Sequence, residues 1–226
     1  MDMKFLILSI FWVPFIRTTA GIPIPPRYDG FIFSDTSSSS SPVLLEAFID
    51  PLCSDSADAW PTVKRIAQHF QDDLMLIVHP FPLPYHHNAF FACRAMHIIN
   101  KLNSTLTYPL LELFFENQDS FSTSGTIEET PSSVIERIVE LATNSFSNLV
   151  SSGFESDFKA GFSDPGMDMM TRISFKFGCS RVVVGTPYFF VNGIPVYDAD
   201  SSWNFIQWAE LIEPLIGNNK GAHSIA

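Results

Sequence analysis

The chain has 226 residues, of which 46% are hydrophobic, and it contains 22 phenylalanines. One large domain, or a domain with a sizeable insertion, can therefore bury a substantial core, and global disorder is excluded. The formal net charge of −11 is opposite in sign to the charge that a sequence-independent nucleic-acid surface needs, so nucleic acid is not an expected partner.

The first twenty residues have the pattern of a signal peptide. Lys4 precedes an apolar run, residues 5–16, that is too short to cross a bilayer as a helix, and small residues follow before Gly21. An uncleaved anchor is the alternative, and Pro14 inside the run and Arg17 after it argue against it. No later segment is long enough to cross a membrane. We therefore expect residues 1–20 to be removed and the mature chain to have no membrane contact.

Two further features agree with a secretory route to the outside of the cell or to a vacuole. Asn103 lies in "NST", the single glycosylation sequon of the chain. The C-terminal sequence "NNKGAHSIA" is no retention signal of the endoplasmic reticulum. The expected compartments are oxidising, so disulfides can persist there.

The first half of the mature chain predicts a strand–helix–strand unit. Residues 21–42 are rich in proline and then serine, which indicates an extended lead-in and a solvated loop. Residues 42–50 and 74–81 are short apolar runs typical of buried strands, and residues 55–73 between them have helical spacing, with Pro61 inside. Such a unit predicts two parallel strands with a right-handed crossover.

The second half predicts a long helical region followed by a hairpin and a last helix. Residues 86–178 are helical in pattern, and the final helix of this region opens with Asp164 and Pro165 and stops at Gly178. Residues 184–198 predict two strands joined at "NG", a strong hairpin signal, and residues 201–217 predict an amphipathic helix.

Three features together resemble the thioredoxin superfamily: a strand that leads to a cysteine at a helix start, a helix with an internal proline, and "GTP" followed by "YFFVNG" at residues 185–193. The helical block and its opening "FPLPYHHNAFFACRA" resemble the DsbA-like branch, in which a helical domain is inserted into that fold. The resemblance covers residues 28–217 and is close to a group of plant secreted proteins. It implies an α/β thioredoxin fold, a central mixed sheet flanked by helices, with an inserted all-helical subdomain.

The resemblance also implies a division of the chain. Residues 28–85 and 180–217 correspond to the two halves of the thioredoxin fold, and residues 86–179 to the helical insertion. The signal peptide of residues 1–20 and the lead-in of residues 21–42 precede them, and residues 218–226 are expected to form a flexible tail.

The family carries Cys-X-X-Cys at the strand-to-helix turn, and this chain has Cys53 and Ser56 at those two positions. A serine hydroxyl is too weak an acid to release a mixed disulfide as a second thiol does. It can still donate a hydrogen bond to a Cys53 thiolate. The helix N-terminus favours that thiolate, whereas Asp50, Asp55 and Asp58 oppose it. The resemblance thus implies one catalytic cysteine, with Ser56 as its partner.

The late "GTP" motif corresponds in the family to a cis proline that faces the reactive cysteine. Carried over, Pro187 is the cis proline and Thr186 the residue that binds substrate through its backbone. Without the resemblance, an ordinary trans proline that opens a strand is the favoured interpretation.

Cys93 and Cys179 lie where the insertion leaves and rejoins the thioredoxin part, so they are candidates for a disulfide. In the chain-entropy model such a bond, closing a loop of about 86 residues, stabilises by about 4–5 kcal/mol. The alternative is two buried free thiols. A third possibility pairs Cys53 with another cysteine.

No metal site or cofactor is predicted. His86 and His87 are adjacent, and Cys93 and His97 share a helical face, but no second pair has ligand spacing. Two functions stay open. The first is a monothiol thiol–disulfide oxidoreductase or isomerase-like enzyme that acts on polypeptide or glutathione thiols. The second is a non-catalytic peptide-binding or chaperone-like module with an inert Cys53.

Overall fold

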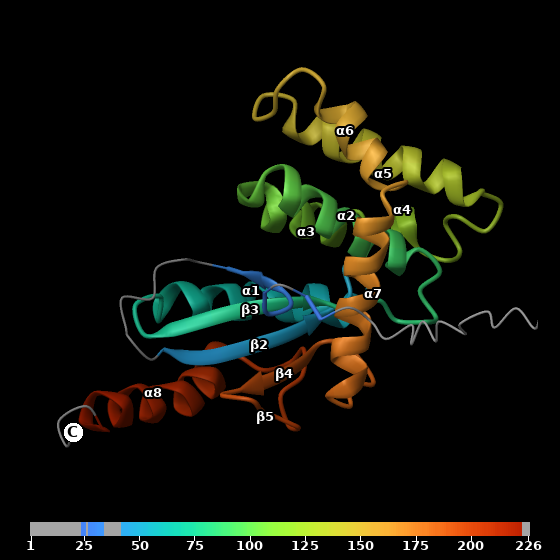
Figure 1. Cartoon of the computed structure of the whole chain (residues 1–226). Coiled ribbons are helices and arrows are strands. Elements are labelled where there is room, and N and C mark those ends of the chain that lie inside the picture. Colours follow the sequence, from blue (N-terminus) through green and yellow to red (C-terminus); the bar gives the residue numbers. More distant parts are fainter. Residues whose placement is uncertain (1–23, 26, 34–41, 223–226) are drawn as a thin grey trace, which may run out of the picture.

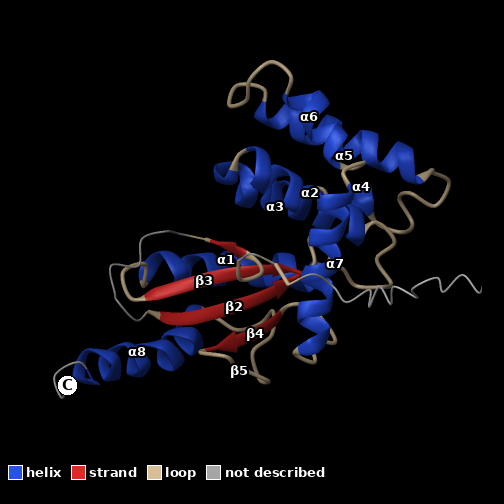
Figure 2. Cartoon of the chain, viewed as in Figure 1, coloured by secondary structure: helices blue, strands red, loops and turns tan. Residues whose placement is uncertain are grey.

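The computed structural model describes residues 24–25, 27–33 and 42–222. The predicted signal peptide lies outside these ranges. Figure 1 shows a sheet with helices against it and a second group of helices above it, linked to the sheet by one long helix. In Figure 2 all the strands belong to the sheet, and the region above it is helical. No helix in the described ranges is long and apolar enough to span a membrane.

The sheet has five strands in the order β1-β3-β2-β4-β5, with β2 and β3 parallel and every other pair antiparallel. The strands are β1 (Phe31–Ile32), β2 (Val43–Ile49), β3 (Leu74–Pro80), β4 (Tyr188–Val191) and β5 (Ile194–Pro195). Because β2 and β3 are covered on both faces, they are apolar nearly throughout, as buried parallel strands are. The predicted strand–helix–strand unit is therefore present.

The helices follow the order that the sequence predicts. They are α1 (Ser54–His69), α2 (Ala89–Leu102), the 3-10 turn η1 (Ser104–Leu106), α3 (Thr107–Glu116), α4 (Gln118–Phe121), α5 (Pro131–Phe146), α6 (Phe154–Gly161), α7 (Pro165–Ser180) and α8 (Phe205–Ala222). Thr130 caps α5 and Asp164 caps α7, each accepting from a backbone N–H of the first turn.

Helix α8 continues to Ala222, past residue 217, where the sequence predicts a flexible tail to begin. An established helix adds one hydrogen bond per further residue, and no proline follows Pro214 to stop it.

Strand β2 separates two apolar clusters because its alternate side chains point to opposite faces. Leu45, Ala47 and Ile49 belong to the larger cluster, which continues through α1 and α8 and into the insertion. Phe48 points the other way, into a smaller cluster that we call the α7-side cluster. It consists of Phe48, Cys53, Phe81, Leu83, Val183 and Phe190, with Phe175, Phe177 and Tyr188 packed against it.

Gly178 lets α7 approach this α7-side cluster closely. A Cβ atom at this position would lie 2.5 Å from Phe81 Cδ2 and 3.3 Å from Phe48 Cδ1. We expect Gly178→Ala to lower the free energy of unfolding by about 1–2 kcal/mol, because overpacking outweighs the gain in helix propensity. Urea unfolding measures this. Gly185→Ala, where the added Cβ meets no atom within 4 Å, is the matched control, and an equal loss in both variants would contradict the packing argument.

Candidate functional site

Cys53 lies at the junction of β2 and α1, at the edge of the sheet where both parallel strands end. It is the N-cap residue of α1, with extended backbone angles (φ −89°, ψ 124°). Its thiol donates a hydrogen bond to the Thr186 carbonyl oxygen, with Sγ and O 3.3 Å apart. The peptide bond between Thr186 and Pro187 is cis. The fold thus brings together two segments that are 133 residues apart.

Ser56 does not make the hydrogen bond to Cys53 that the sequence suggests. Its side chain is fully buried, and its Oγ has no hydrogen-bond partner among the described residues. The physical reason is the N-cap conformation of Cys53, which turns the sulfur toward Thr186 rather than along the helix. The Thr186 hydroxyl is also buried without a partner in the described part of the chain. Two unpaired hydroxyls therefore belong to the residues around the thiol, although a buried hydroxyl normally finds a partner.

Of the two alternatives for Cys93 and Cys179, a disulfide or two buried free thiols, the structure has both cysteines free, with Cys93 buried and Cys179 exposed. Cys93 is fully buried, and burial raises the pKa of its thiol well above the ordinary value. On α7 it is Gly178 that faces the sheet, whereas Cys179, the next residue and about 100° further around the helix, is exposed. The spacing in the sequence places both residues near the insertion boundary, but it does not fix which way each side chain points.

The predicted glycosylation residue, Asn103, ends α2 at the surface. Its side-chain oxygen accepts hydrogen bonds from Thr105 N and Oγ1, at 3.1 and 2.7 Å. The side chain thereby caps the short 3-10 turn η1. Glycosylation of Asn103 stays a prediction.

Asp50 is the site residue whose role the sequence reasoning missed. It is fully buried, and its Oδ1 accepts from Leu52 N at 2.8 Å. Its Oδ2 accepts from Leu83 N at 2.9 Å and lies 2.8 Å from His86 Nδ1. This hydrogen bond to Asp50 raises the pKa of His86, which is partly exposed. Asp50 therefore ties the turn that carries Cys53 to the loop that enters the insertion.

A signal for this pairing exists in the sequence. Asp50 directly follows β2, and His86 lies in the loop after β3. Because parallel strands end at the same edge of a sheet, polar residues just beyond both strands are brought close together.

We expect Asp50→Asn to lower the free energy of unfolding by about 2–3 kcal/mol. An amide has one acceptor oxygen, so its NH₂ group faces a backbone donor that the carboxylate now satisfies, and the charged bond to His86 is lost. Urea unfolding measures the stability, and NMR titration of His86 should show its pKa falling. Asp55→Asn, an exposed carboxylate without a partner in the described residues, is the control. An unchanged His86 titration would contradict the assignment.

A residue of the helical insertion also hydrogen-bonds to the turn that carries Cys53. The Gln118 amide, at the start of α4, donates to the carbonyl oxygens of Pro51 and Cys53, at 3.2 and 2.8 Å. Tyr85, which is 62% exposed, lies near the same turn, where partial burial and the nearby Cys53 and Asp50 raise the pKa of its phenol. The turn around Cys53 is thus held between the thioredoxin part and the insertion.

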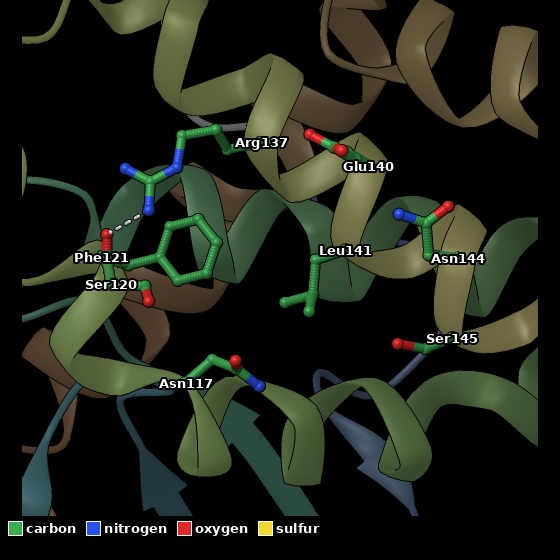
Figure 3. A pocket seen from close by; sticks show the side chains of 8 residues that line it. All are labelled: Asn117, Ser120, Phe121, Arg137, Glu140, Leu141, Asn144 and Ser145. Carbon is green, nitrogen blue, oxygen red and sulfur yellow. Dashed lines mark hydrogen bonds between the residues drawn. The ribbon is translucent and has the colours of Figure 1, made fainter.

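A pocket of about 260 Å³ on the insertion does not include Cys53, Ser56 or Thr186. Figure 3 shows the Arg137 guanidinium above the Phe121 ring, with its hydrogen bond to the Ser120 carbonyl oxygen. Arg137 also pairs with Glu129. The Arg137 guanidinium of this pocket is therefore already engaged, and no cysteine lines the pocket.

Neither a family model nor a curated protein sequence matches the chain, whereas solved structures do. The thiol-disulfide exchange protein α-DsbA2 from Wolbachia pipientis has a TM-score of 0.62 and 13% identity, over 82% of this chain and 87% of that one. A periplasmic thioredoxin-like protein from Salmonella enterica serovar Typhimurium has a TM-score of 0.58 and 14% identity, over 83% and 90%. MdbA, a thiol-disulfide oxidoreductase from Actinomyces oris, has a TM-score of 0.56 and 20% identity, over 76% and 80%. The chain therefore has the thioredoxin fold in its DsbA-like form, with the helical insertion that the sequence predicts.

Proposed function

We propose that the protein carries out thiol–disulfide exchange on polypeptides through Cys53 alone. The observation that supports this most directly is the contact between Cys53 Sγ and the Thr186 carbonyl beside Pro187, at the N-terminus of α1. A helix N-terminus stabilises a thiolate, and the thiolate is the nucleophile in exchange. The neighbouring structures described as thiol-disulfide exchange proteins and oxidoreductases support the same class of reaction.

The reaction proceeds in two exchanges that conserve electrons. The Cys53 thiol loses its proton to water, and the thiolate attacks one sulfur of a substrate disulfide. A bond forms between Cys53 Sγ and that sulfur, while the other substrate sulfur leaves as a thiolate. Because Ser56 cannot supply a second thiol, the mixed disulfide waits for an outside thiolate, which attacks the substrate sulfur and expels the Cys53 thiolate. The net result is a rearranged disulfide, as in isomerisation.

The compartment belongs to the same proposal. Thiol–disulfide exchange on polypeptides is useful where disulfides persist, and the predicted signal peptide and sequon direct the chain to the secretory pathway, extracellular or vacuolar.

A second candidate is the non-catalytic peptide-binding or chaperone-like module. The observation that favours it is the burial of Cys53, which is only 6% exposed. In this alternative the groove beside Thr186 and Pro187 binds peptide, and the sulfur never reacts.

Trapping of the mixed disulfide separates the two. We expect a blocked peptide disulfide, added to the Cys179→Ser protein, to release one peptide thiol per chain and to leave one peptide attached at Cys53. Added thiol should then release that peptide. Mass spectrometry of the intact protein measures both steps, and the protein with Cys53→Ser in addition is the control. Peptide that binds without any adduct would favour the second candidate.

A further inference from the structure

Two exposed carboxylates lie on α1 just after Cys53. Asp55 lies in the first turn of α1 and Asp58 one turn along, so the two share a face of the helix. Both are exposed, and neither carboxylate has an ion pair or a hydrogen bond among the described residues. Asp55 lies close enough to Tyr85 for its charge to act on that phenol, together with Cys53. Asp55, two residues after Cys53, therefore brings its negative charge close to the turn that carries the thiol.

The insertion contributes the same charge from the opposite side. Gln118 touches the backbone of Cys53, and Glu116 and Asp119 lie on either side of it in the chain. Both are exposed and form no ion pair within the described ranges. Two elements from different parts of the chain therefore carry exposed, unpaired carboxylates next to the turn that contains Cys53. We call Asp55, Asp58, Glu116 and Asp119 the acidic rim.

Positive groups that could neutralise this rim are engaged elsewhere. Seven of the described lysine and arginine side chains pair with carboxylates. Arg65 lies over the Phe205 ring, and Arg27 donates to a backbone carbonyl. Lys176, exposed on α7, makes none of these contacts. His86 is committed to Asp50.

Two further observations indicate that this rim is a binding surface. Thr186, whose carbonyl contacts the Cys53 thiol, is 8% exposed and its hydroxyl has no partner in the described structure. A buried hydroxyl of this kind can bond to a polar group of a bound chain. Exposed apolar side chains lie in two loops near Cys53. Tyr85, in the loop after β3, is 62% exposed, and Val184, in the loop that leads to Thr186, is 81% exposed. A polypeptide offers backbone polar groups and apolar side chains together.

We propose that the acidic rim selects cationic polypeptide segments as the thiol partners of Cys53, in preference to anionic thiols such as glutathione. This inference rests on the proposed function and adds the substrate class. In the releasing step, the thiolate of a cysteine flanked by lysine attacks the substrate sulfur of the mixed disulfide. A disulfide forms between the two polypeptide sulfurs, and the bond to Cys53 Sγ breaks with return of its thiolate. No electron donor or acceptor is needed beyond these thiols.

The size and the salt dependence of the effect follow from Coulomb's law. One pair of charges a few ångströms apart in water changes a rate by about fivefold, so exchanging lysine for glutamate in the partner should change it by at least that much. Salt at about 0.5 M reduces the Debye length to a few ångströms. The rates of the lysine-containing and the glutamate-containing partner should then lie within about twofold of each other.

The experiment uses two blocked pentapeptides that differ only in whether lysine or glutamate flanks the central cysteine, with glutathione as a third thiol. Each thiol releases a neutral peptide from the mixed disulfide at Cys53 in the Cys179→Ser protein. Every rate is divided by the rate of the same thiol with a neutral small-molecule disulfide. We expect the lysine peptide to be about fivefold or more faster than the glutamate peptide and glutathione at about 20 mM salt.

Two charge variants complete the test. The double variant Asp55→Asn and Asp58→Asn should lose most of the preference, whereas Asp72→Asn with Glu155→Gln, an equal change of net charge away from the site, should keep it. Equal normalised rates for the three thiols, or a preference that both double variants keep, would overturn the inference and leave the proposed function intact. Failure of the mixed disulfide to form at all would overturn the proposed function itself.

Discussion

Ser56→Cys is expected to shorten the lifetime of the mixed disulfide at Cys53 by at least about 100-fold. A thiol one helical turn from Cys53 attacks within the molecule, and well-oriented intramolecular groups have effective concentrations of about 10⁵ M or more, against millimolar outside thiol. The Ser56 hydroxyl has no hydrogen-bond partner in the described structure, so the substitution breaks no bond there. Rapid acid quenching followed by mass spectrometry measures the decay of the adduct.

Ser54→Cys is the matched control, because Ser54 is exposed and directly follows Cys53, and neighbouring helix residues do not face each other as residues three apart do. It adds the same thiol two residues earlier and should leave the lifetime nearly unchanged. If Ser56→Cys also leaves the lifetime unchanged, the missing second thiol is not what makes Cys53 a monothiol site.

His79→Ala is expected to lower the free energy of unfolding by about 3–5 kcal/mol near pH 5.5, because it removes one partner from a buried charge network. The His79 side chain is fully buried between two carboxylates. Its Nδ1 lies 2.9 Å from Asp29 Oδ2, and its Nε2 lies 3.3 Å from Glu46 Oε1. Glu46 also pairs with Arg181 and accepts from the Tyr28 hydroxyl. This network ties the N-terminal segment before β1 to the sheet and to the end of α7.

The loss should depend on pH in a defined direction. The hydrogen bond that His79 Nδ1 donates to Asp29 and the nearby negative charge of Glu46 outweigh burial and raise the pKa of His79. Its contribution is therefore full below the ordinary value of about 6.5 and is lost as pH rises through the raised value. The same network lowers the pKa of Glu46 to about 2 and lowers that of Asp29, so their contribution is present above about pH 4 and is lost in strong acid. The difference between wild type and His79→Ala should therefore be largest near pH 5–6.

His97→Ala gives the opposite trend and serves as the comparison. Burial lowers the pKa of His97 to about 4, so its neutral form contributes stability above about pH 6.5, and this contribution falls as pH drops toward 4. Urea unfolding at several pH values between 5 and 9 measures both variants. Parallel curves for the two would contradict the charge assignment of His79.

The sequence predicts the sheet well where one local pattern decides the structure. The apolar runs of β2 and β3 have no competing helical period, and both become strands. The "NG" turn between β4 and β5 needs two residues with positive φ, and Asn192 and Gly193 have φ of 48° and 81°. These elements are determined by residues adjacent in the chain.

The sequence fails where a distant partner decides the structure. Glu46 is a charged residue within an apolar strand, and no neighbouring residue in the sequence indicates that Arg181 and His79 will pair with its carboxylate. Local spacing suggests a Cys53–Ser56 hydrogen bond, whereas Cys53 bonds to Thr186, 133 residues away, beside the cis Pro187 that only the family resemblance places there. The orientation of Cys179 depends on which face of α7 packs, and that face is selected by Gly178 against Phe81.

The most direct test of the account is a competition between the two cysteines for a limiting amount of labelled peptide disulfide. Cys179 is exposed and Cys53 is almost buried, so accessibility alone directs the label to Cys179. A site built for exchange directs it to Cys53, where the helix N-terminus and Thr186 hold the sulfur. Peptide mapping of the wild-type chain should place most of the label on Cys53. Label confined to Cys179, with Cys53 unmodified, would contradict the account.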